Sequence, residues 1–106
     1  MTEQSHHGWD LWIASPIVHL SSCDPSRITL HDRGEDTYER WAVHTECLPT
    51  DGRKPFLFFG LYTDDLSEAT AEFGRRAKAD HNNFTAQQQT LAHARDRKER
   101  HAVRHR

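Results

Sequence analysis

Histidine is the residue type with metal-binding or proton-transfer chemistry that stands out, because the chain has nine in 106 residues. His101 and His105 lie four residues apart, so a helix would place both on one face. The glutamate that follows the first histidine in zinc-protease motifs is absent. The histidines His6 and His7 form, with Asp10, a second candidate metal-binding group, which is equally weak. Because the histidines are spread along the chain, we expect no metal site and no cofactor.

The segment His44-Thr45-Glu46-Cys47 has the spacing at which zinc deaminases place a histidine ligand and a general acid–base glutamate. Those enzymes complete the site with a Pro-Cys-x-x-Cys motif, which this sequence lacks. On a strand, His44 and Glu46 would share one face while Cys47 lies on the other. We therefore expect an outward polar face here and an inward cysteine.

No serine or cysteine is marked by its neighbours as a nucleophile. The sequence has no G-x-S-x-G motif, no G-x-G-x-x-G motif and no P-loop. A chain of this size that uses its apolar bulk for one small core has little room for a deep pocket. We therefore expect a protein that is not an enzyme.

The C-terminal segment ARDRKERHAVRHR, residues 94–106, is strongly basic. Residues 84–106 carry six basic and two acidic side chains, a net charge of +4, whereas residues 1–83 carry eight basic and fourteen acidic ones, a net charge of −6. Such a segment can contact phosphates or an acidic protein surface, or it can be a solvated helix end that suits the helix dipole. We predict that partner binding uses Arg95, Arg97, Lys98, Arg100, Arg104 and Arg106.

Composition divides the chain into a compact domain, residues 1–83, and a basic helix or tail, residues 84–106. Hydrophobic residues make up 35% of the chain, below the usual share of about 45–50%, and no aromatic residue follows Phe84. No apolar run approaches the ~20 residues that span a bilayer, and the first residues lack the features of a signal peptide. We expect a cytoplasmic protein with two free thiols and no membrane contact.

Four segments have strand patterns: 9–20, divided by Pro16, then 27–32, 37–47 and 56–62. Turn residues at 32–36 and 49–55 join the last three into a meander. Within 37–47, alternation predicts that Trp41 and Val43 point inward while His44 and Glu46 point outward. The run FLFFGLY, residues 56–62, predicts a central strand that is buried on both faces.

The apolar period changes after residue 63. Leu66, Ala69, Phe73 and Ala77 form one stripe of an amphipathic helix, which Asp65 and Glu68 would begin as a capping box. The sequence DHNN, residues 80–83, is predicted to end this helix, and Thr85 with Gln88 to begin a second, basic one. The predicted fold class is α+β: an antiparallel meander sheet of about four strands, one packed amphipathic helix and a basic C-terminal helix.

A single packed helix covers only one face of such a sheet. The apolar residues on the other face then need cover from the N-terminal segment, the second helix or another chain, and large exposed apolar patches mark interfaces. We therefore expect a small, non-catalytic protein-interaction or regulatory module. It would bind a protein partner and form a homodimer through a sheet face and the basic helix. The alternative is a small nucleic-acid-binding regulator that uses the same helix on phosphates.

Overall fold

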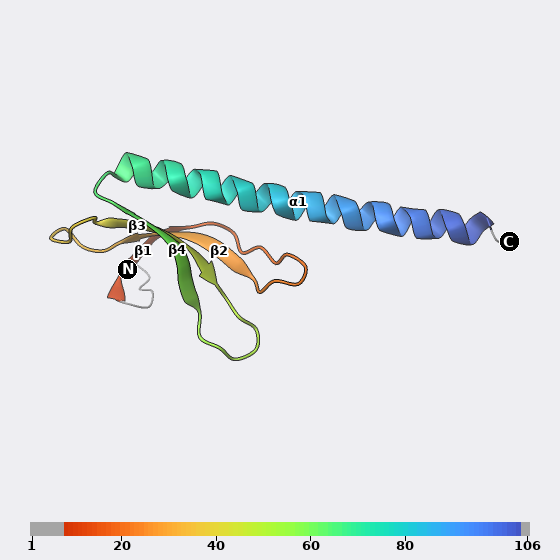
Figure 1. The fold of residues 1–106 in the computed structure, drawn as a ribbon, viewed down its shortest axis with the longest axis horizontal. Helices are drawn as coiled ribbons and strands as arrows, with labels where there is room; N and C mark the ends of the chain where they lie inside the picture. Colours follow the sequence, from red (N-terminus) through yellow and green to blue (C-terminus); the bar gives the residue numbers. More distant parts are fainter. Residues whose placement is uncertain (1–7, 105–106) are drawn as a thin grey trace.

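The computed structural model describes residues 8–104, with the side chains of residues 8–94. It contains strands β1 (Asp10–Ala14), β2 (Ser26–Asp32), β3 (Trp41–Cys47) and β4 (Phe56–Thr63), followed by helix α1 (Leu66–Arg104). The strands form an antiparallel sheet in the order β1-β2-β3-β4, and α1 lies across one face of it (Figure 1). The predicted α+β fold with a four-stranded meander is confirmed.

The core lies between α1 and the two inner strands. Leu30 of β2 and Val43 of β3 are partners in the sheet register, and neither has any exposed surface. The alternation of β2 and β3 and the i, i+3, i+7 stripe of α1 bring apolar side chains into this one layer. The buried members are Ile28, Leu30, Trp41, Val43 and Ala69, with Leu61, Leu66, Phe73 and Ala77 packed against them.

Asp65 caps the start of α1, as the sequence predicts. Its Oδ1 accepts hydrogen bonds from the backbone N–H groups of Ser67, at 2.8 Å, and Glu68, at 3.3 Å. The second half of the predicted capping box differs, because the Glu68 carboxylate accepts a hydrogen bond from Thr63 Oγ1 at 3.2 Å. Thr63 Oγ1 in turn accepts from Asp65 N–H at 3.1 Å. This relay ties the end of β4 to the first turn of the helix.

The predicted helix break at residues 80–83 is wrong, since α1 runs without interruption from Leu66 to Arg104. The asparagines there cost only about 0.7 kcal/mol each relative to alanine. The β1–β2 loop contacts the helix about one turn further along, where Ser21 N–H donates to Gln87 Oε1 at 2.7 Å. Tertiary contact therefore outweighs the weak local preference for a helix end.

The predicted central position of residues 56–62 is also wrong, because β4 lies at the edge of the sheet. Phe56 and Phe59 have 43% and 75% of their surface exposed. The central place belongs to β3, which pairs with both β2 and β4. His44 and Glu46 of β3, predicted to point outward, are buried.

The sheet face opposite α1 is filled by polar and aromatic side chains of the chain itself. His44 Nε2 and Tyr62 Oη share a hydrogen bond of 2.8 Å, and the Trp9 ring stacks on His44 with centroids 6.0 Å apart. The Arg33 guanidinium lies 5.1 Å from the centroid of Trp9 and 4.9 Å from that of Tyr62. Glu46 is satisfied by Arg27, at 2.6 Å. These pairs explain why polar residues are buried on this face.

Candidate protein-docking site

A bulge shapes the middle of β4. The register with β3 shifts between Val43 and Thr45, and this shift leaves Phe59 and Gly60 together opposite His44. A bulge of this kind turns a strand locally and changes the direction of one side chain. Its position therefore decides how the aromatic residues of β4 are presented.

Glycine at position 60 allows the close approach of His44 and Tyr62. A Cβ added there would lie 2.6 Å from His44 Nε2 and 2.8 Å from Tyr62 Cε2. Both distances are too short for real contacts, so a larger residue would displace the hydrogen-bonded His44–Tyr62 pair. An isolated glycine in a strand often marks a bulge or a close approach of neighbouring side chains, and both occur at Gly60.

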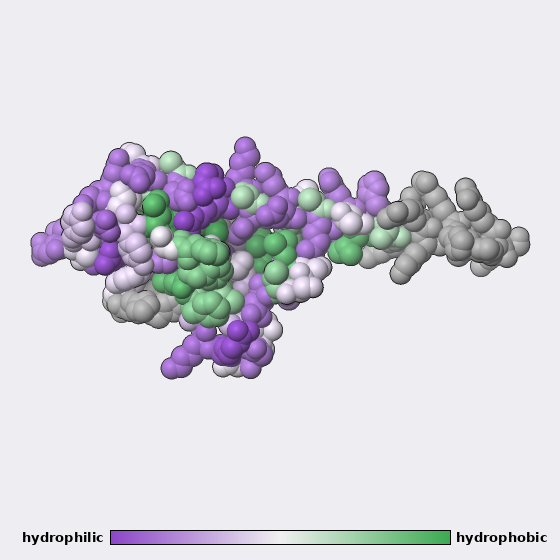
Figure 2. All heavy atoms as spheres, in the orientation of Figure 1, coloured by the Kyte–Doolittle hydropathy of each residue, from purple (hydrophilic) through white to green (hydrophobic). Residues whose placement is uncertain are grey.

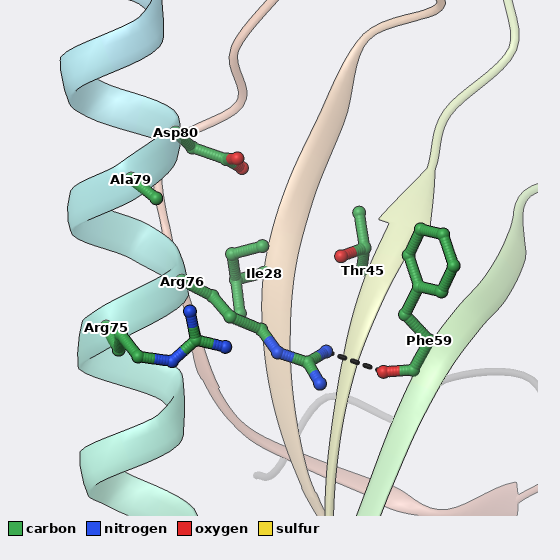
Figure 3. Close-up of a pocket in the computed structure, with 7 residues that line it drawn as sticks. All are labelled: Ile28, Thr45, Phe59, Arg75, Arg76, Ala79 and Asp80. Atoms are coloured by element: carbon green, nitrogen blue, oxygen red, sulfur yellow. Dashed lines mark hydrogen bonds between the residues drawn. The ribbon is translucent and has the colours of Figure 1, made fainter.

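Phe59, the residue before this glycine, has a left-handed backbone with φ of +55°. Bulky residues adopt this conformation rarely, and it costs roughly 1–2 kcal/mol. Its carbonyl oxygen accepts a hydrogen bond from Arg76 Nη1 at 2.6 Å, which fixes the backbone to α1 (Figure 3). The residue nevertheless remains 75% exposed. The chain thus holds a phenylalanine in an unfavourable conformation with its ring in solvent.

Three phenylalanines of β4 form a continuous aromatic surface, which we call the β4 aromatic surface: Phe56, Phe58 and Phe59. The ring centroids of Phe56 and Phe58 are 5.9 Å apart, and those of Phe58 and Phe59 are 4.8 Å apart. Figure 2 shows apolar side chains gathered beneath α1 and over β4. Contiguous apolar surface of this kind is typical of an interface.

A groove lies between α1 and this surface, with a cavity of about 310 Å³. We call it the α1–β4 groove; its lining residues are Ile28, Thr45, Phe59, Arg75, Arg76, Ala79 and Asp80. Figure 3 shows its floor on the strands and its wall on the helix. Four strands spaced about 4.8 Å apart form a sheet wider than one helix, whose diameter is about 10 Å. A single helix therefore leaves this side of the sheet uncovered.

The two arginines of the groove wall, Arg75 and Arg76, are held by one neighbouring carboxylate. Glu72 pairs with Arg75 at 2.7 Å and with Arg76 at 2.8 Å. These hydrogen bonds lower the pKa of Glu72 to about 2. Burial raises the pKa of Asp80 above its ordinary value. Glu72, Arg75 and Arg76 therefore form a network of charges along the wall, above a floor that consists of Ile28, Thr45 and Phe59.

A second cavity, also about 310 Å³, lies at the other end of the β4 aromatic surface. Its lining combines the β1–β2 loop with the start of β2, the end of β3 and β4: Leu20, Cys23, Asp24, Ser26, Cys47, Phe56 and Phe58. Both cysteines are free thiols, with Cys23 exposed and Cys47 buried. Burial, assisted by the negative charge of Asp24, raises the pKa of the Cys47 thiol. This thiol is therefore a poor nucleophile.

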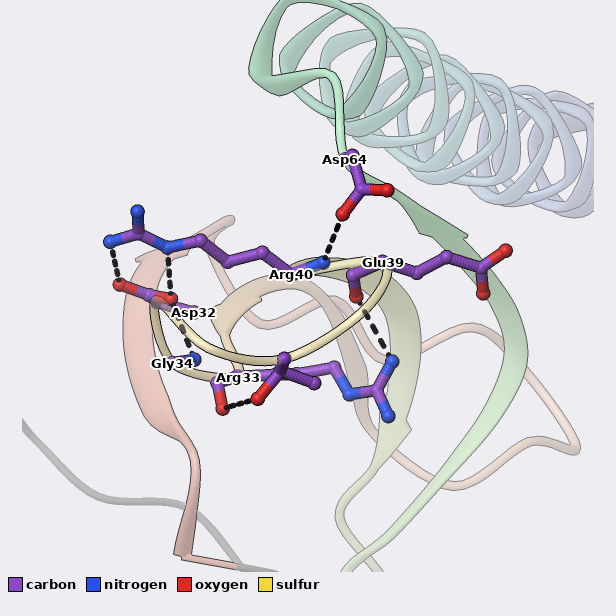
Figure 4. Close-up of polar contacts among 7 residues, drawn as sticks. Asp32, Arg33, Gly34, Glu39, Arg40 and Asp64 are labelled. Carbon is purple, nitrogen blue, oxygen red and sulfur yellow. Dashed lines mark hydrogen bonds and ion pairs between the residues drawn. The ribbon is translucent and has the colours of Figure 1, made fainter.

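The opposite end of the molecule, where α1 begins, is acidic. The β2–β3 loop is held by a two-pronged ion pair between Arg40 and Asp32, at 2.8 and 2.9 Å, which lowers the pKa of Asp32. Arg40 N–H donates to Asp64 Oδ1 at 3.2 Å, so the loop is joined to the start of α1 (Figure 4). The acidic side chains of the loop and of the first helical turns thereby lie at one end, while the basic segment lies at the other.

The structure places the backbone of the predicted basic residues on the continuation of α1, as far as Arg104. The side chains of Arg95, Arg97, Lys98, Arg100, Arg104 and Arg106 lie outside the described side chains. Their predicted role in partner binding stays a prediction. Among the side chains that the structure describes, no group of three or more His, Cys, Asp and Glu residues could hold a metal ion.

Sequence reasoning missed Phe59 and the arginine that fixes its carbonyl. One signal was available, because Gly60 interrupts an otherwise apolar strand.

Within residues 8–104 no helix is both long and apolar enough to cross a membrane. Comparison of the chain with protein-family models, with curated proteins and with solved structures gave no match.

Proposed function

We propose that this protein is a non-catalytic interaction module that self-associates through the β4 aromatic surface and the α1–β4 groove. The single observation that carries this proposal is the presentation of Phe59. Its left-handed backbone is costly, and its exposed ring gains little from the fold of one chain. Burial of such a ring in an interface would contribute about 1.5–3 kcal/mol.

A second copy of the chain is the partner that the charge distribution favours. Residues 1–83 carry a net charge of −6 and residues 84–106 a net charge of +4. The structure separates these charges along the molecule, because the acidic start of α1 and its basic end are about 58 Å apart in a helix of 39 residues. Two copies in opposite orientation would bring unlike charges together, which favours association and fixes its register.

Polar groups around the two cavities support a non-catalytic role. Arg75 and Arg76 are both engaged by Glu72, and the buried Cys47 thiol has a raised pKa. A catalytic site instead needs a base or nucleophile whose pKa suits its reaction. The cytoplasmic location expected from the sequence stays a prediction.

Sedimentation equilibrium of the wild type and two asparagine variants tests the proposal. Phe59→Asn removes the ring and keeps a residue that tolerates the left-handed conformation. Tyr38→Asn removes another exposed aromatic ring, 81% exposed on the β2–β3 loop, and serves as the matched control. We expect wild type and Tyr38→Asn to associate alike and Phe59→Asn to associate at least tenfold more weakly. Equal association of all three proteins would contradict the proposal.

Nucleic-acid binding remains the second candidate, and one observation favours it. The helix continues to Arg104, so the basic residues follow one another on a regular backbone along which phosphates could lie. Fluorescence anisotropy with a labelled DNA duplex across a salt series distinguishes the two functions. Phosphate binding would weaken steeply as salt rises, and it would not respond to Phe59→Asn.

A further inference from the structure

The apolar stripe of α1 that faces the sheet continues beyond the sheet. Leu91 lies 18 residues after Phe73, which is five turns of an α-helix, so both residues lie on the same face. Phe73 packs against the core, whereas Leu91 is 48% exposed. Figure 1 shows that this part of α1 extends past the strands and loops. Leu91 therefore lies on the sheet-facing side of α1, at a point that the sheet of its own chain does not reach.

In the part of the chain that the structure describes, the helix beyond the sheet lacks a sheet beneath it, and the α1–β4 groove is a sheet surface that lacks a second helix above it. Its floor consists of Ile28, Thr45 and Phe59, the Arg76 side chain crosses it to the Phe59 carbonyl (Figure 3), and Phe59 is left exposed. Its wall is formed by residues 75–80 of α1. A helix that entered this groove would lie next to α1, at the usual interaxial distance of about 8–10 Å.

We propose that the groove receives the C-terminal part of α1 from a second copy, with the two helices antiparallel and centred near Thr85. This inference rests on the proposed function and names the segment that binds. In this register, residue 91 of one helix lies at the level of residue 79 of the other. Leu91 of each copy then lies above the groove of its partner, beside the exposed residue Phe59. The contact is reciprocal, as a two-fold dimer requires.

The same register also pairs the charges. Residues 64–72 contain four acidic side chains and no basic one. Residues 98–104 of the partner helix, which would lie beside them, carry three basic side chains and one acidic. A parallel arrangement would instead place the two basic segments together. Apolar cover and charge pairing therefore select the same orientation.

Disulfide trapping tests this orientation in the full chain. Ala79 lies on the wall of the groove, and Thr90 is 11 residues further along, about three turns, so both lie on the same face of α1. We would introduce Ala79→Cys and Thr90→Cys, together and singly, into a Cys23→Ser background, and oxidise with copper–phenanthroline. Within one chain the two positions are about 16 Å apart along the helix, too far for a disulfide.

The antiparallel register predicts efficient cross-linking of the double variant to a covalent dimer. Each single variant should stay uncross-linked, because equivalent residues would be about 15–18 Å apart. Cross-linking of the single variants as efficient as that of the double variant would show a parallel pair and overturn the inference. Circular dichroism of each reduced variant, compared with the wild type, controls for folding.

The Phe59→Asn substitution separates failure of this inference from failure of the proposed function. An absent cross-link together with association that Phe59→Asn abolishes would overturn the helix register alone. An absent cross-link together with a monomeric wild type, or with association that Phe59→Asn does not change, would overturn both the helix register and the proposed function. The charge pairing predicts in addition that Arg100→Glu/Arg104→Glu weakens association several-fold, whereas Lys54→Glu, a reversal in the exposed β3–β4 loop, does not.

Discussion

Substitution of Gly60 by alanine tests how the bulge of β4 is built. The added Cβ would lie 2.6 Å from His44 Nε2, 2.8 Å from Tyr62 Cε2 and 3.0 Å from His44 Cδ2. His44 is 3% exposed and cannot move outward freely. The methyl group must therefore force apart two rings that share a hydrogen bond of 2.8 Å.

The expected cost combines three terms. Overpacking of a filled layer costs about 1–3 kcal/mol, and loss of the His44–Tyr62 hydrogen bond costs about 1 kcal/mol. Alanine has fewer conformations than glycine in the unfolded chain, which stabilises the folded state by about 0.4–1 kcal/mol. The free energy of unfolding should thus fall by about 2 kcal/mol, which lowers Tm by roughly 10 °C in a domain of this size.

Gly74→Ala is the matched control. Gly74 lies inside α1, and a Cβ there meets nothing within 4 Å apart from its chain neighbours and the backbone of its own helix, so this change should raise the free energy of unfolding by about 1 kcal/mol. Urea unfolding, followed by tryptophan fluorescence at a protein concentration at which all variants are monomeric, measures both changes. If Gly60→Ala were as stable as the wild type, the account of the bulge would be refuted.

Three further predictions follow from the side-chain contacts. The pKa of Glu72 is about 2 when folded, against 4.5 ordinarily, so its stabilising contribution is full above pH ~4.5 and is lost as pH falls towards ~2. Unfolding free energies measured against pH should therefore converge at low pH for the wild type and Glu72→Gln, and parallel curves would contradict the pairing. Phe59→Asn should raise the monomer's free energy of unfolding by about 0.5–1 kcal/mol, because asparagine tolerates the left-handed backbone; a clear loss of stability in urea unfolding would show that the ring supports the fold. Of the two thiols, exposed Cys23 should react rapidly with Ellman's reagent and buried Cys47 only on unfolding, whereas two rapid thiols would show that the cavity between them opens readily.

The fold class and the helix start could be predicted from the sequence because both depend on local patterns. Alternation in β2 and β3 and the spacing of Leu66, Ala69 and Phe73 are local. So is the cap at Asp65, whose oxygen lies two and three residues from its donors. The course of α1 past residues 80–83 depends instead on the β1–β2 loop, which is more than sixty residues away in the chain.

The candidate site was predicted only in outline. An apolar run such as FLFFGLY is compatible with a doubly buried strand and with an edge strand that presents aromatic rings, and periodicity does not distinguish them. The burial of His44 depends on Tyr62 and Trp9, partners from other strands and from before β1. Phe59 adopts its left-handed backbone in the bulge that also brings Gly60 close to His44 and Tyr62. These contacts are set by tertiary structure, which a single strand's sequence does not contain.

The most direct measurement of the central claim is an isotope-filtered NOESY spectrum on a sample of mixed labelled and unlabelled full-length chains. It detects contacts between protons of different copies alone. The account predicts intermolecular cross-peaks between the methyl groups of Leu91 and the ring protons of Phe59. A spectrum at a concentration where the chain associates, with intermolecular peaks but none to the Phe59 ring, would contradict the account.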